Sequence, residues 1–105
     1  ALMAVDGVRG GGPDAVVEIR SPGDETYEKL DFFAVLRVRE VVVIDRDSRK
    51  AEIFRLAGSK YVAVAADREG WLTSEALRVR FQILAGGKPR LALEDLDAAS
   101  RRIEI

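Results

Sequence analysis

The sequence predicts an α/β fold in which a mixed sheet contains one βαβ unit and is extended by antiparallel hairpins. Three observations predict it. Residues 14–20 alternate between apolar and polar side chains, residues from about 25 to 36 repeat apolar positions at helical spacing, and residues 40–45 form a β-branched run. A strand, a helix of about twelve residues and a second strand make a βαβ unit, whose two strands are parallel.

The first strand follows a loop at Gly10–Pro13, which cannot continue a helix or a central strand. Alternation divides it into an apolar face and a mixed face. The apolar face carries Ala15, Val17 and Ile19, and the mixed face carries Asp14, Val16, Glu18 and Arg20.

The predicted helix runs from about Glu25 to Leu36, and either Ser21 or Asp24 could cap it. Its expected buried stripe consists of Thr26, Tyr27, Leu30, Phe33 and Ala34, with Lys29 on the border. The run at Glu40–Asp45 is typical of a strand covered on both faces.

The rest of the chain predicts antiparallel hairpins. Strands are expected at Ala51–Leu56 and Tyr61–Ala66, and then around residues 79–83 and 91–93, separated by glycine-containing turns. Residues 69–75 are expected to be loop, and the tail to Ile105 could add a helical turn or an edge strand.

Composition excludes several functional classes. The 105 residues suffice for one domain over 1–105, which we expect to be incomplete at its N-terminal side, and no apolar run is long enough for a membrane helix. Without cysteine or histidine there is no disulfide, no thiolate or imidazole metal site and no histidine-based catalysis. Lack of cysteine is weakly in favour of a cytoplasmic location. The net charge of −1 requires any nucleic-acid binding to use a local patch.

Glu18 is the main candidate for chemistry because a carboxylate within an apolar strand is costly unless a cation or metal ion pairs with it. Oxygen ligands favour magnesium, manganese or calcium. Arg20 lies roughly 6–7 Å along the same face, and Lys29 could reach this strand end from the helix. Asp14 lies roughly 13 Å from Glu18 along the strand and is a weak candidate for the same ion. Alternatively, Glu18 and Arg20 form a same-face salt bridge and Lys29 is a solvated surface residue.

Four segments together resemble the Uma-two family of proposed restriction endonucleases, within the PD-(D/E)xK nuclease superfamily, over about Gly7 to Val64. They are Pro13–Pro22, Asp24–Leu30 followed by Phe33, Val38–Asp45, and Ile53–Leu56. The resemblance implies a restriction-endonuclease-like core, a DNA substrate and a Mg²⁺ or Mn²⁺ cofactor.

By this resemblance Glu18 is the metal-binding carboxylate, and Lys29 is the catalytic lysine supplied from the helix. Arg20 stands where the superfamily usually has lysine, and Asp14 matches a second family aspartate. The superfamily's other metal-binding acids would come from earlier segments, where Asp6 is the only upstream acid of this sequence.

Two functions follow from these observations. The first is a metal-dependent DNA endonuclease that uses Glu18, Lys29 and Arg20. The second is a catalytically degenerate nuclease-like fold that acts as a homodimeric assembly or binding module, pairing through a sheet edge left open beside the first strand.

Overall fold

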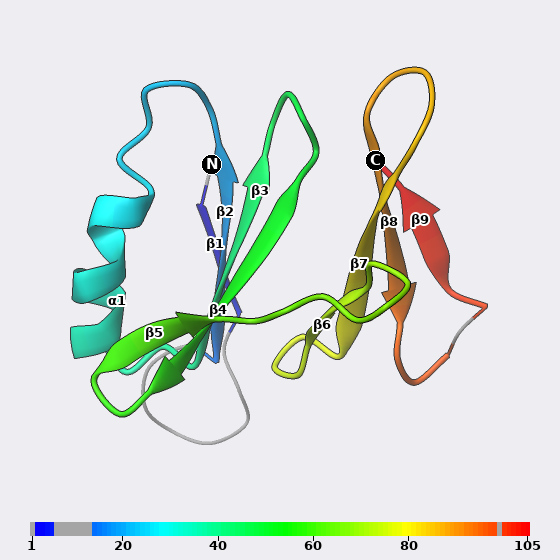
Figure 1. The fold of residues 1–105 in the computed structure, drawn as a ribbon. Helices are drawn as coiled ribbons and strands as arrows, with labels where there is room; N and C mark the ends of the chain where they lie inside the picture. The colour runs from blue at the N-terminus through cyan, green and yellow to red at the C-terminus, as the bar shows by residue number, and fades with distance from the viewer. Residues whose placement is uncertain (1, 6–13, 99) are drawn as a thin grey trace.

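The structure, a computed structural model, describes residues 2–5, 14–98 and 100–105, and side chains from residue 14 onward. The described strands form two sheets (Figure 1). The five-stranded sheet has the order β1 (Leu2–Val5), β2 (Ala15–Arg20), β3 (Glu40–Asp45), β4 (Ala51–Ala57), β5 (Lys60–Ala63). The four-stranded sheet has the order β6 (Leu72–Ser74), β7 (Val79–Leu84), β8 (Arg90–Asp95), β9 (Arg102–Glu104). The loop predicted at Gly10–Pro13, like Asp6, lies outside the described residues.

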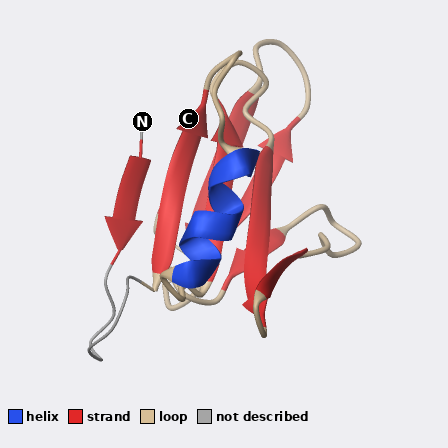
Figure 2. Ribbon diagram, turned by 90° about the vertical axis from the view of Figure 1, so that its left-hand side faces the viewer, coloured by secondary structure: helices blue, strands red, loops and turns tan. Residues whose placement is uncertain are grey.

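The predicted βαβ unit is confirmed. Strands β2 and β3 are parallel, with Glu18 beside Val43 and Arg20 beside Asp45. They are joined through a 3₁₀ turn, η1 (Tyr27–Lys29), and the helix α1 (Leu30–Val35), which lies against one face of the sheet (Figure 2). The other strand pairs are antiparallel, so the sheet is mixed and carries hairpins as expected.

The helical segment is shorter than predicted, because turns occupy both of its ends. Ser21 and Asp24 do not cap it: the Ser21 N–H donates to the Asp24 carboxylate at 2.8 Å, and the Asp24 N–H donates to the Ser21 carbonyl at 3.1 Å. At the other end the N–H of Arg37, at φ 60°, donates to the carbonyl of Ala34, and the N–H of Val38 donates to that of Phe33. These two bonds form a Schellman motif that stops the helix.

Three further expectations are corrected by the structure. Tyr27 is exposed rather than part of the buried stripe. Leu72–Ser74, expected to be loop, forms β6 because it pairs with β7. The sheet edge expected to be open beside β2 is occupied, since β1 pairs with β2 in antiparallel register. The tail adds an edge strand, β9, which pairs with β8.

Two hydrophobic cores lie on opposite faces of the five-stranded sheet. One is between the sheet and α1 and contains Val16, Phe33, Val38, Val41 and Val43. The other is between the two sheets and contains Val42, Ile44, Ile53, Phe81 and Leu91. Strand β3 contributes to both, which explains its unbroken apolar run.

A buried glutamate, Glu40, joins the two sheets. Its carboxylate accepts hydrogen bonds from Arg55 at 2.8 and 3.0 Å, from the Ser74 hydroxyl at 2.7 Å, and from the N–H groups of Glu75 and Ala76 at 3.2 Å. Burial opposes ionisation, but the bonds from Ser74, Arg55 and the backbone outweigh it and hold the pKa of Glu40 below 4.5. Glu40 is therefore a charged structural residue at the junction of β3, β4 and β6.

Candidate active site

The candidate site is centred on Glu18, in the middle of β2. Its side chain faces α1 and is only 4% exposed, although its neighbours on that face are the apolar Val16 and Val43. Lys29, the last residue of η1, places Nζ 2.9 Å from Glu18 Oε1. The turn before the helix thus brings a cation to the strand, as the sequence led us to expect.

The two partners differ in exposure. The Lys29 side chain is 45% exposed, so its ammonium group faces both the carboxylate and solvent. The hydrogen bond to Glu18 is the main cause of a raised pKa for Lys29, which therefore stays protonated at neutral pH. Glu18 Oε2 is buried and has no hydrogen-bond partner among the described residues. A buried carboxylate oxygen without a donor is costly, so it is the position where a cation would be stabilising.

Arg20 does not form the salt bridge with Glu18 that was the alternative interpretation. Its guanidinium group instead approaches Asp45 on β3, at 3.5 Å, and lies 5.2 Å from the centre of the Tyr27 ring. The N–H groups of Ser48 and Asp47 lower the pKa of Asp45, so Arg20 faces a carboxylate that stays ionised. Arg20 is thus held beside the Glu18–Lys29 pair rather than within it.

Tyr27 and Glu52 were not among the predicted site residues. The Tyr27 hydroxyl donates to the Glu52 carboxylate, and this bond is the main cause of a raised pKa for Tyr27. The Tyr27 ring packs edge-on against Phe54, two residues further along β4. Helical periodicity predicted that Tyr27 is in the core, and its pairing with Glu52 depends on strand register, which that periodicity does not give.

Asp14 is separated from the other candidates. It precedes β2, at the opposite end of the strand from Arg20, and its carbonyl accepts a hydrogen bond from the Glu40 N–H at 3.1 Å. Its side chain is partly exposed. The expectation that Asp14 is a poor partner for Glu18 around one ion agrees with this placement.

A comparison with protein families decides the family of this chain. The model of the family described as "Uma2: Putative restriction endonuclease" matches residues 5–86. The chain belongs to the Uma2 family. A search of curated proteins found no match, and neither did a search of solved structures.

The Uma2 match contains every candidate site residue and extends beyond the resemblance noted in the sequence, which ended near Val64. It covers the five-stranded sheet from Val5 onward and strands β6 and β7, whereas β8 and β9 lie outside it. No helix in the described part of the chain is long and apolar enough to cross a membrane.

The Mg²⁺ or Mn²⁺ ion expected from the sequence fits this site only in part. Glu18 Oε2 is an unpartnered oxygen of the right chemical type. Among the described residues, however, no three acidic side chains lie close enough to hold an ion. Glu18 can therefore supply one ligand, and a full coordination shell needs donors from outside this group of residues.

Proposed function

We propose that this Uma2 protein is a metal-dependent DNA endonuclease in which Glu18 is a metal ligand and Lys29 is the catalytic cation. The observation that carries the proposal is the buried Glu18 carboxylate, in which one oxygen pairs with Lys29 and the other has no hydrogen-bond partner among the described residues. A structural ion pair would be expected to satisfy both oxygens. Family membership supports a DNA substrate and a divalent ion.

Each residue has a defined task in this proposal. Lys29 has three N–H donors and uses one for Glu18, so the others can bind a non-bridging phosphate oxygen and stabilise the charge that develops there. Arg20, held by Asp45, offers a second cation beside the same strand end. A bound Mg²⁺ or Mn²⁺ would supply Lewis-acid activation of the phosphate and of water.

Cleavage of supercoiled plasmid with Mg²⁺ or Mn²⁺ tests the proposal. The wild-type protein should nick or linearise the plasmid, and Glu18→Gln and Lys29→Met should each slow cleavage by on the order of a hundredfold or more. Lys60→Met is the matched control, because Lys60 is an exposed lysine in β5. Cleavage at the wild-type rate by Glu18→Gln would refute the assignment.

A second candidate function is a non-catalytic, homodimeric assembly module. It is favoured by the apolar side chains that α1 exposes, Phe32 at 61% and Val35 at 78%, and by the incomplete set of acidic ligands. Sedimentation equilibrium separates the two candidates. A dimer that Phe32→Ser and Val35→Ser dissociate, in a protein without metal-dependent cleavage, would support assembly, and a monomer would exclude it.

A further inference from the structure

We propose that the β3–β4 hairpin and Arg20 form a surface that binds the phosphate backbone of duplex DNA next to Glu18 and Lys29. The proposal rests on DNA being the substrate in the proposed function. The surface consists of four cations, here called the hairpin cations: Arg20, Arg46, Arg49 and Lys50.

The topology of the sheet brings the hairpin cations to the candidate site. Because β2 and β3 are parallel, their C-terminal ends meet at one end of the sheet, where Arg20 lies opposite Asp45. The Arg46 N–H donates to the Arg20 carbonyl at 2.9 Å, which fixes the hairpin beside β2. Arg20 follows Glu18 by two residues on the same face, at roughly 6–7 Å along the strand. A phosphate chain that passes Lys29 can therefore continue over the hairpin.

Two of the four hairpin cations lack a carboxylate partner in the described part of the chain. Of the other two, Arg20 approaches Asp45 at 3.5 Å. Asp45 is bound by the N–H groups of Asp47 and Ser48 at 2.9 Å, and Asp47 pairs with Arg46 at 3.3 Å. Arg49 and Lys50 have no carboxylate partner within the described residues. Guanidinium and ammonium donors left free in this way are suited to phosphate oxygens.

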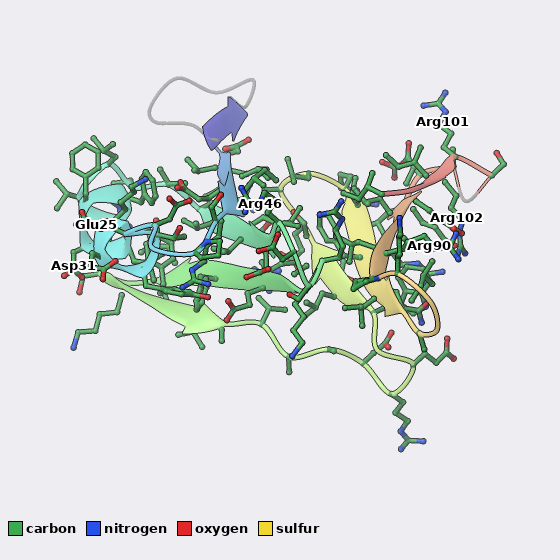
Figure 3. All side chains as sticks on the ribbon, turned by 90° about the horizontal axis from the view of Figure 1, so that it is seen from above. Glu25, Asp31, Arg46, Arg90, Arg101 and Arg102 are labelled. Atoms are coloured by element: carbon green, nitrogen blue, oxygen red, sulfur yellow. The ribbon has the colours of Figure 1, made fainter. Side chains whose placement is uncertain are left out.

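The four-stranded sheet differs, because each arginine of its strands is paired with a carboxylate: Arg80 and Arg102 pair with Glu94 at 2.6 and 3.0 Å, and Arg90 pairs with Glu104 at 3.0 Å. Figure 3 shows Arg46, in the turn between β3 and β4, apart from Arg90, Arg101 and Arg102. In a chain of net charge −1, DNA binding needs local positive charge, and the hairpin supplies it beside the candidate site.

Two cations at the other end of the five-stranded sheet, which also have no carboxylate partner among the described residues, provide a control. Arg39 immediately precedes β3 and Lys60 begins β5, so both lie at the end of the sheet opposite the hairpin. Both side chains are exposed. Removing these two charges changes the net charge as much as removing those of Arg49 and Lys50, and it leaves the proposed surface intact.

The test is the binding of a fluorescently labelled random-sequence duplex, followed by anisotropy in EDTA over a range of salt concentrations. The paired variant Arg49→Gln/Lys50→Gln should bind more weakly than wild type, and the slope of log K against log salt should be about 1.8 shallower, as for two lost phosphate contacts. Arg39→Gln/Lys60→Gln should bind like wild type. Equal losses in the two variants, or no binding by the wild type, would overturn the proposal.

Two additional measurements separate the possible failures. If the hairpin variant lost affinity for polyglutamate but kept its affinity for the duplex, the partner would be an acidic polypeptide and the DNA assignment would be wrong. Glu18→Gln should cleave the duplex on the order of a hundredfold more slowly than wild type. If Glu18→Gln abolished cleavage while the hairpin variant bound normally, the DNA surface would be refuted and the endonuclease would stand.

Discussion

At the residue scale, the protein keeps the Glu18 carboxylate in an apolar environment and pairs it with the ammonium group of Lys29. Glu18 faces the core between the sheet and α1, and Lys29 reaches it from a 3₁₀ turn. Pairing removes part of the cost of burying the charge, but no residue that the structure describes bonds to Oε2. Burying the Glu18 carboxylate in this way lowers the stability of the folded protein. Binding of a cofactor or substrate at this position could restore that stability.

Changes at this pair should not be additive. Lys29→Met leaves a buried carboxylate without its cation, so it should lower the urea midpoint of unfolding. Adding Glu18→Gln removes that unpaired charge, and the double variant should have a higher midpoint than Lys29→Met alone. Urea denaturation of the four proteins at pH 7 measures this. A double variant whose loss equals the sum of the two single losses would show that the pair is not energetically coupled.

The sequence was sufficient to identify this pair as a candidate, and it left the partners of Arg20 and Tyr27 unidentified. A charged residue in an apolar strand stands out in any sequence, and a lysine one turn into the next helix lies within reach. The pairing of Arg20 with Asp45 and of Tyr27 with Glu52 depends on strand register and on the length of a 3₁₀ turn. Neither can be obtained from the spacing of apolar residues.

At the scale of elements, β3 is the central element because both of its faces are buried. Val42 belongs to the core between the sheets, while Val41 and Val43 belong to the core under α1. Its composition predicted this burial. The extent of the helix was not predictable in the same way, because a tight turn at Ser21–Asp24 and a left-handed Arg37 decide where it begins and ends.

Truncating a buried valine of β3 should reduce stability more than truncating an exposed valine of α1. Val42→Ala removes two methyl groups from a fully buried position between the sheets and should reduce the free energy of unfolding by about 2 kcal/mol. Val35→Ala, at an exposed position of α1, should change it by less than about 0.5 kcal/mol. Chemical denaturation of both variants provides the measurement. Comparable effects from the two substitutions would contradict the placement of β3 in two cores.

At the scale of the whole molecule, the two sheets are joined by an apolar core and by the hydrogen bonds of Glu40. The sequence predicted the hairpins that build the second sheet. It did not predict how that sheet packs. Residues 69–75 have no apolar–polar alternation that would indicate β6, and the sequence places Glu40 only at the start of a strand. The contacts of Glu40 with Ser74 and Ala76 span more than thirty residues and appear only in the folded chain.

The Glu40 network should make stability depend on pH. Since the pKa of Glu40 is lower in the folded protein than its ordinary value of 4.5, its contribution is fully present above that value and is lost as the pH falls through the folded pKa. Glu40→Gln should cost about 2–4 kcal/mol at pH 7. The difference between wild type and variant should shrink below pH 4.5. Thermal unfolding of both proteins from pH 7 to pH 3 tests this, and a difference that does not vary with pH would argue against an ionised Glu40.

The central claim is that Glu18 binds a divalent ion beside Lys29, and calorimetric titration with Mn²⁺ tests it most directly. Wild-type protein should show saturable binding, and Glu18→Gln should lose it or bind far more weakly, while Lys60→Met should bind like wild type. Absence of binding by the wild type, or binding of equal strength by Glu18→Gln, would contradict the claim.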